Sequence, residues 1–138
     1  MMMTEQYAKT RILVADNSIS SRVLLRGLMM QLLGIPAENI LEAVDGEAVL
    51  AAVQTAAQEG APFDALLLDL YMPNMSGQQV LAALNERGQK IPVLIVTSEP
   101  GEATHQQLRG AGATDVLVKP FEGGLLKLKL EAVLAGAS

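Results

Sequence analysis

Five short apolar runs that start 23 to 28 residues apart constrain the fold of this 138-residue chain more than any other feature. The runs are Ile12–Ala15, Ile40–Val44, Ala65–Leu68, Val93–Val96 and Val116–Val118. Runs that are apolar almost throughout, rather than at alternate positions, are typical of strands buried on both faces of a parallel sheet. Because a crossover between parallel strands needs roughly a dozen residues or more, each gap has room for a helix. The spacing therefore predicts strands that alternate with helices.

The segments between these runs carry helical periodicity and capping residues. In the first segment, a mostly apolar stripe is formed by Val23, Leu24, Gly27, Leu28 and Gln31, and Gly34 stands where a helix C-cap is expected. The later segments predict helices from about Gly46 to Glu59, Ser76 to Gly88, Glu102 to Arg109 and Glu122 to Leu134. Five strands and five helices in alternation predict an α/β fold, a three-layer sandwich with right-handed crossovers.

The composition excludes several classes of protein. Ten basic and fifteen acidic residues leave a net charge of −5, which argues against a nucleic-acid-binding surface. The absence of Cys excludes disulfide scaffolds, cysteine-based zinc sites and thiol nucleophiles. No apolar run approaches the ~18 residues of a membrane span, and the first residues lack the layout of a signal peptide. We expect a cytoplasmic protein with no membrane partner, one domain over residues 10–135, a flexible tail over 1–9 and a second tail over 136–138.

Polar residues follow four of the five predicted strands at the point where each strand ends. Asp16 and Asn17 follow the first strand, Asp69 the third, Thr97 the fourth and Lys119 the fifth. The carboxyl ends of parallel strands lie along one edge of the sheet, where such folds bind ligands. A Lys or an Asp beside a buried run is costly without a partner. We therefore expect the carboxylates, the hydroxyl and the ammonium to converge there.

The chemistry of this set favours phosphoryl transfer. Acidic oxygens without Cys or a nearby His favour a hard cation such as Mg²⁺ over zinc. A carboxylate beside Mg²⁺ can attack phosphorus and form an aspartyl-phosphate. A hydroxyl and an ammonium can then hold the phosphoryl oxygens, whose charge must be stabilised.

Four motifs in this order resemble those of bacterial response-regulator receiver domains. They are Ile12–Asn17, Leu66–Gly77, Val96–Ser98 and Val118–Phe121, and the similarity covers about Thr10 to Leu134. The resemblance implies a flavodoxin-like, doubly wound sheet with strand order 2-1-3-4-5. It also implies a cis bond before Pro120.

The resemblance assigns a role to each converging residue. Asp69 would accept a phosphoryl group from the phosphohistidine of a histidine kinase or a phosphotransfer domain. Asp16 would hold Mg²⁺, largely through water, and the backbone carbonyl of Tyr71 would bind it directly. Asn17 and Asp69 are the other expected metal ligands. Thr97 would hydrogen-bond the phosphoryl group, and Lys119 would form an ion pair with it.

The chain departs from the family pattern at two positions. Asn17 stands where most receivers have a second acidic metal ligand. Its amide oxygen can still coordinate a hard cation, it can cap the first helix, or it can mark a weaker metal site. Val116 stands where most receivers have an aromatic switch residue. Tyr71, expected as a partly exposed loop side chain, replaces the second Asp of haloacid-dehalogenase-type phosphatases, so efficient phosphatase activity is not expected.

Three further residues are expected at the surface. His105 lies in a short polar segment and is expected to be solvated, and Arg22 and Arg26 are expected to form a solvated helix face. Flavodoxin-like electron transfer shares the architecture, but the loop that begins with Asp16 is acidic where a flavin phosphate would sit.

The leading prediction is a phosphorylation-dependent signalling switch that acts through contact with an unknown downstream protein. It would show at most slow self-phosphorylation and self-dephosphorylation. Two alternatives stay open. One is a pseudo-receiver that keeps the fold without phosphorylation, which Asn17 and Val116 favour and Asp69, Thr97 and Lys119 oppose. The other is a receiver taken from a larger regulator or hybrid kinase.

Overall fold

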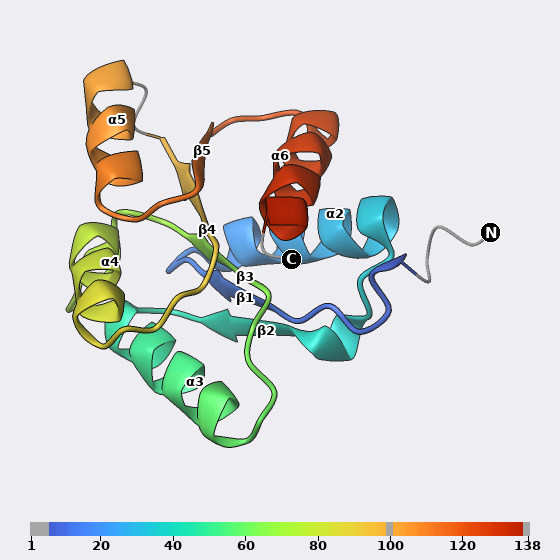
Figure 1. Cartoon of the computed structure of the whole chain (residues 1–138). Helices are drawn as coiled ribbons and strands as arrows, with labels where there is room; N and C mark the ends of the chain where they lie inside the picture. The colour runs from blue at the N-terminus through green and yellow to red at the C-terminus, as the bar shows by residue number, and fades with distance from the viewer. Residues whose placement is uncertain (1–5, 99–100, 137–138) are drawn as a thin grey trace.

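The computed structural model describes residues 6–98 and 101–136, in which one parallel sheet is covered on both faces by helices (Figure 1). The strands are β1 (Ile12–Ala15), β2 (Ile40–Ala43), β3 (Ala65–Leu68), β4 (Val93–Thr97) and β5 (Asp115–Val118). The helices are α2 (Ile19–Leu33), α3 (Gly46–Gln58), α4 (Gly77–Glu86), α5 (Glu102–Gly110) and α6 (Gly123–Gly136), with a 3-10 turn η1 (Ala37–Asn39). The sheet order is β2-β1-β3-β4-β5, which confirms the predicted fold.

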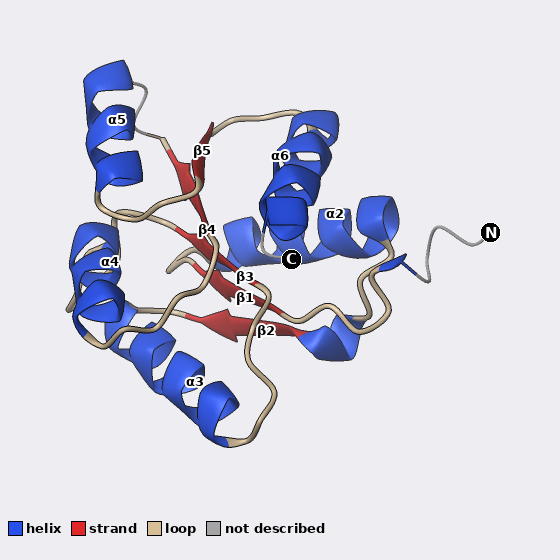
Figure 2. Cartoon of the chain, viewed as in Figure 1, coloured by secondary structure: helices blue, strands red, loops and turns tan. Residues whose placement is uncertain are grey.

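Each strand supplies side chains to two separate cores, because successive residues point to opposite faces of the sheet. Leu13 and Leu66 pack with α3, α4 and α5 on one face. Val14 and Leu67 pack with α2 and α6 on the other face. Figure 2 shows the three layers, with the strands between the two groups of helices. This double burial explains why the central strands are apolar almost throughout.

Side-chain caps fix where three helices begin, next to the loops at the carboxyl edge of the sheet. The hydroxyl of Ser18 caps α2, the carboxylate of Asp45 caps α3, and Ser76 caps α4 in a capping box with Gln79. The N-cap role considered for Asn17 is therefore wrong, because Ser18 accepts the N–H at the third helical position.

Strand β2 differs from the prediction of strands buried on both faces. It lies at the edge of the sheet and pairs only with β1. Leu41 is 36% exposed, Glu42 is exposed, and Val44 after the strand is 50% exposed. An edge strand has a neighbouring strand on one side only. Ile40 and Ala43 at the ends of β2 are buried, whereas the two residues between them are exposed.

The apolar stripe expected on α2 is also not the face that packs on the sheet. The buried residues are Leu25, Met29 and Leu33, four positions apart on one side of the helix. Val23 and Leu24 are 64% and 52% exposed. Apolar residues extend around more than one side of α2, so their spacing alone could not identify the buried side.

Two rings expected at the surface are buried. Tyr7, within the predicted tail over residues 1–9, packs into the core between α2 and α6, and its carbonyl accepts the N–H of Thr10 at 3.1 Å. The expectation of a tail therefore does not hold for Tyr7, while residues 1–5 lie outside the described residues. His105 is 7% exposed because it shares the inner side of α5 with Leu108, three positions later. Within the described ranges, no helix has the length and apolar character needed to cross a bilayer.

Candidate functional site

The structure brings the four predicted functional residues together at the carboxyl edge of the sheet. Asp16, Asp69 and Lys119 lie directly after β1, β3 and β5, and Thr97 ends β4. The ammonium nitrogen of Lys119 lies 2.8 Å from Asp16 Oδ2 and 3.7 Å from Asp69 Oδ2. The backbone N–H of Lys119 donates to the carbonyl of Thr97 at 2.7 Å. Residues from four of the five strands, β1, β3, β4 and β5, thus converge on one point.

Asp16 is held by hydrogen bonds at every polar group. Its N–H donates to the carbonyl of Ala43 at 3.1 Å, and its Oδ1 accepts the N–H of Ser18 at 2.9 Å. Its Oδ2 accepts from Lys119, and its carbonyl accepts from Arg22 Nη1 at 2.7 Å. Only 1% of Asp16 is exposed. This carboxylate is therefore fixed in place before any ligand arrives.

Asp69 is a buried carboxylate whose charge is only partly compensated. Burial raises the pKa of Asp69 above its usual value, and the nearby Asp16 carboxylate adds to that rise. Lys119 and the backbone N–H groups of Tyr71 and Leu70 oppose it without cancelling it. An additional cation would lower the free energy of the ionised form of Asp69.

The loop after β3 is packed tightly against neighbouring elements. A Cβ atom on Gly77 would lie 2.6 Å from the carbonyl oxygen of Asp69 and 2.9 Å from Leu70 Cα. The N–H of Gly77 donates to the carbonyl of Leu70 at 2.9 Å. Asn74 has a left-handed φ of 70°, and its Nδ2 donates to Asp45 Oδ2 at 3.3 Å. Glycine at position 77 lets the start of α4 approach the backbone of Asp69.

The remaining predicted positions lie around this centre. Asn17 is exposed and lies between Asp16 and Ser18. The Tyr71 side chain is 57% exposed, so it is a loop side chain as expected, and its N–H donates to Asp69 Oδ1 at 3.4 Å. The bond between Lys119 and Pro120 is cis. Val116 is 3% exposed and belongs to the core under α3, α4 and α5.

The oxygen-rich composition of the site suits a hard divalent cation. Two buried carboxylates face a single ammonium, which leaves one negative charge uncompensated. Among the residues that the structure describes, no three His, Cys, Asp or Glu side chains gather into a metal site. Mg²⁺ would therefore need amide, backbone or water oxygens beside the two carboxylates, which is the ligand set that Mg²⁺ accepts.

Sequence reasoning missed the ion pairs of Arg22 and Arg26, which do not form a solvated face. Both guanidinium groups bind Glu42 on β2, with Nε–Oε distances of 2.7 and 2.9 Å. Arg22 also reaches the carbonyl of Asp16 and is only 12% exposed in its side chain. The sequence held one signal for these ion pairs, because the acidic residue Glu42 interrupts an otherwise apolar strand run and so needs a cationic partner.

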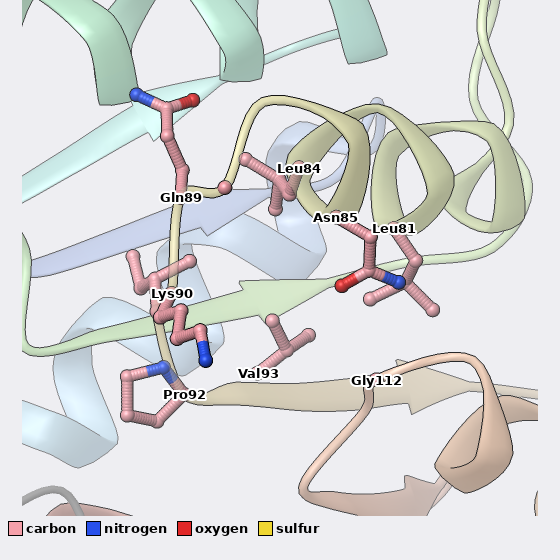
Figure 3. A pocket seen from close by; sticks show the side chains of 10 residues that line it. Leu81, Leu84, Asn85, Gln89, Lys90, Pro92, Val93 and Gly112 are labelled. Carbon is pink, nitrogen blue, oxygen red and sulfur yellow. The ribbon is translucent and has the colours of Figure 1, made fainter.

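A separate hollow lies at the other end of the strands, where β4 begins. It has a volume of about 430 Å³ and lies between the end of α4 and the start of β4 (Figure 3). Leu81, Leu84 and Val93 form apolar walls, and Asn85 donates from Nδ2 to the carbonyl of Ala111 at 2.7 Å. The hollow contains none of the residues of the converging site.

Comparison with known proteins identifies relatives across most of the chain. Residues 12–131 match the family described as response regulator receiver domain. The chain is 33% identical over 125 residues to the chemotaxis protein CheY of Pseudomonas aeruginosa, covering 89% of this chain and 94% of that protein. It is 33% identical over 136 residues to the transcriptional regulatory protein ResD of Bacillus subtilis, covering 97% of this chain and 52% of ResD.

The match to the transcriptional regulatory protein QseB of Escherichia coli O157:H7 is 41% identical over 76 residues and covers 54% of this chain and 34% of QseB. The chain thus spans about a third to a half of the length of these regulators.

Solved structures share the fold. The chemotaxis response regulator CheY4 of Vibrio cholerae superposes with a TM-score of 0.76 at 31% identity, covering 90% of this chain and 98% of that chain. The receiver domain of the Francisella response regulator 1452 has a TM-score of 0.78 at 22% identity, covering 94% and 99%. Receiver domains are generally signalling switches of two-component systems rather than classical enzymes, and they generally bind Mg²⁺ at an acidic pocket. From the family match and from its fold, this chain belongs to the response regulator receiver domain family.

Proposed function

We propose that this protein is a phosphorylation-dependent switch in which Asp69 accepts a phosphoryl group from a phosphohistidine. The observation that carries the proposal is the pair of buried carboxylates that share one ammonium group. A carboxylate oxygen of Asp69 would bond to phosphorus while the bond from phosphorus to the donor imidazole breaks. The imidazole nitrogen would keep the electron pair of that bond.

The neighbouring residues would stabilise the transferred group. Lys119 would pair with a phosphoryl oxygen, and the Thr97 hydroxyl would hydrogen-bond another. Asp16, Asn17, Asp69 and the backbone carbonyl of Tyr71 would hold Mg²⁺, with water completing its shell. When bound, Mg²⁺ would supply positive charge that offsets the charge on the carboxylates and on the phosphoryl group.

The surface beside the site supports docking of a helical phosphohistidine donor, either a histidine kinase or a phosphotransfer domain. Ile19 and Val23 on α2 are 71% and 64% exposed. An apolar hollow of about 230 Å³ between Leu24 and Phe121 reaches Lys119. An apolar face next to the reacting carboxylate would seat such a partner with its imidazole at Asp69. The exchange would take place in the cytoplasm, and output would follow through contact with a downstream protein.

The direct test is phosphate uptake from acetyl phosphate with Mg²⁺, measured by intact-mass spectrometry. The wild-type protein should gain one phosphate, and Asp69→Asn should gain none. Asp115→Asn is the matched control, because it removes a paired carboxylate on β5 outside the site. Uptake that persists in Asp69→Asn would refute the phosphoacceptor assignment. No uptake in the wild-type protein would favour the pseudo-receiver alternative.

A second test concerns the weaker metal site that Asn17 implies. Asn17→Asp adds a carboxylate beside Mg²⁺, while repulsion from Asp16 and Asp69 offsets part of the gain. We expect Mg²⁺ affinity to rise about tenfold, or about 1.4 kcal/mol. Amide NMR titration with MgCl₂ measures both affinities. Equal affinities would show that the amide serves as well as a carboxylate.

A further inference from the structure

We propose that Arg22 is a positioning residue that fixes the peptide between Asp16 and Asn17, and so sets the affinity of the site for Mg²⁺. The inference rests on the proposed function, because it assigns a role within the same metal site. Nothing in the sequence pattern or in the family match assigns a role to Arg22.

The guanidinium group of Arg22 connects two elements through rigid, short contacts. Its Nη1 donates to the carbonyl of Asp16 at 2.7 Å, and its Nε donates to Glu42 Oε1 at 2.7 Å. The donors of a guanidinium group lie in one plane at fixed angles, so the position of one partner restricts that of the other. With 12% of its side chain exposed, Arg22 is largely shielded from competing water.

The far end of this connection is itself anchored. Arg26 Nε donates to Glu42 Oε2 at 2.9 Å. Arg26 also donates to the carbonyls of Ala37 and Ile40, where β2 begins. Burial alone would raise the pKa of Glu42, but hydrogen bonds from Arg22 and Arg26 hold the pKa below its usual value. Glu42 is thus a fixed, ionised support for the guanidinium of Arg22.

The peptide that Arg22 contacts decides where Asn17 lies. The carbonyl of Asp16 belongs to the peptide unit that leads into Asn17, so its rotation moves the Asn17 backbone. Among the described residues, none forms a hydrogen bond with the exposed side chain of Asn17. The other end of this short loop is fixed by the bond from the Ser18 N–H to Asp16 Oδ1 at 2.9 Å. Between these two bonds, the orientation of Asn17 depends on Arg22.

Two possible roles of Arg22 predict effects of opposite sign. If its positive charge acted only through space, removal would strengthen binding of a divalent cation, because a repulsive charge would be lost. If Arg22 positions the loop, removal would weaken Mg²⁺ binding despite that lost repulsion. A charge-conserving change isolates the second effect, because Lys keeps the charge but cannot donate two bonds in a fixed plane.

The experiment is an amide NMR titration of the whole chain with MgCl₂, following Asn17, Ser18 and Tyr71. Arg22→Met and Arg22→Lys are compared with Arg26→Met and Arg26→Lys, which alter the other guanidinium on Glu42 without touching Asp16. We expect Mg²⁺ to bind about fivefold more weakly to Arg22→Met and about twofold more weakly to Arg22→Lys. The Arg26 variants should lose less affinity than the matching Arg22 variants, because Arg22 keeps its bonds to Asp16 and Glu42 when Arg26 is changed. Without Mg²⁺, only the Arg22 variants should shift the amide signal of Asn17.

Unfolding in urea without Mg²⁺ controls for general loss of stability, and Arg22→Lys keeps the test valid if Arg22→Met does not fold. Arg22 variants that bind Mg²⁺ as tightly as the Arg26 variants would overturn the positioning role and leave the proposed function intact. A wild-type protein that binds no Mg²⁺ would overturn the metal site and this inference together.

Discussion

Each of the two edge strands of the sheet carries one carboxylate that binds two cations, but the cations connect different parts of the molecule. The side chains of Glu42 on β2 and Asp115 on β5 are each about a third exposed, and each carboxylate binds two cations. Arg22 and Arg26 lie 2.7 and 2.9 Å from Glu42, while Arg109 and Lys129 both lie 3.1 Å from Asp115. The charges and distances are similar, so the difference lies in what each set of cations connects.

At β2 both cations come from one helix, α2, and one of them continues to the backbone of Asp16. At β5 the cations come from α5 and α6, which cover opposite faces of the sheet (Figure 1). The first arrangement holds the loop that begins at Asp16, and the second ties two helices to one strand. We call the surroundings of Asp16 and Asp69 the receiving side, and β5 with α5 and α6 the reporting side.

Position 116, on β5, holds a small residue. Val116 is buried on β5 and has a single short, stiff χ1 rotation. It cannot sweep the volume that a turning aromatic ring would. Asp115 also binds α5 and α6 to β5. We therefore expect the receiving side to have its geometry before a ligand binds, and the reporting side to change little when a ligand does bind.

The largest effect is expected from Gly77→Ala on the receiving side. Its Cβ would lie 2.6 Å from the Asp69 carbonyl oxygen, so α4 must move away from the site. We expect a loss of about 2 to 3 kcal/mol in the free energy of unfolding, measured in urea. Gly27→Ala, in the middle of α2 with nothing within 4 Å of its Cβ, should be neutral or stabilising by up to about 1 kcal/mol. Equal effects of the two changes would contradict the tight packing of the receiving side.

A smaller effect of opposite sign is expected from Asp69→Asn. Because the pKa of Asp69 is raised in the folded protein, its ionised form destabilises the fold at neutral pH. The variant should be more stable than the wild-type protein by about 1 kcal/mol at pH 7. This difference should appear above the usual carboxyl pKa of about 3.9 and be complete above the raised pKa of Asp69. Urea unfolding between pH 3 and pH 7 measures it, and a destabilised variant would show that the site carries no strain.

The sequence was sufficient for the strands and for the residues that end them. Asp16, Asp69 and Lys119 could be predicted because each directly follows a buried run, where an unpaired charge is costly. Arg22 could not, because its contacts depend on which strand lies beside β1 and on how far a long side chain reaches. His105 was misplaced because a short polar helix gives a weak apolar pattern, although its spacing to Leu108 matches one helix face.

The smallest effects should come from the two edge carboxylates. Burial would raise the pKa of Asp115, but hydrogen bonds from the Val116 N–H, Arg109 and Lys129 hold the pKa below its usual value, as the arginines do for Glu42. A lowered pKa in the folded state stabilises the fold above the unfolded pKa and is lost as pH falls through the folded pKa. Glu42→Gln and Asp115→Asn should each cost about 0.5 to 1 kcal/mol at pH 7, discounted for solvent screening. The cost should vanish once the pH falls below the lowered pKa of the carboxylate in the folded protein.

Mg²⁺ affinity should also distinguish Glu42→Gln from Asp115→Asn. Glu42→Gln should weaken Mg²⁺ binding along with stability, because it loosens the support of Arg22. Asp115→Asn should change stability alone. A loss of Mg²⁺ affinity in Asp115→Asn equal to that in Glu42→Gln would remove the distinction between the two edges.

The central claim is a fixed receiving side and a reporting side that responds little. Amide NMR with and without beryllofluoride, in the presence of Mg²⁺, tests it most directly, because that anion imitates an aspartyl-phosphate. We expect large shifts only in the loops that follow Asp69 and Thr97, with a modest shift in population elsewhere. Large shifts through Asp115–Val118 and α6, as strong as those beside Asp69, would contradict it.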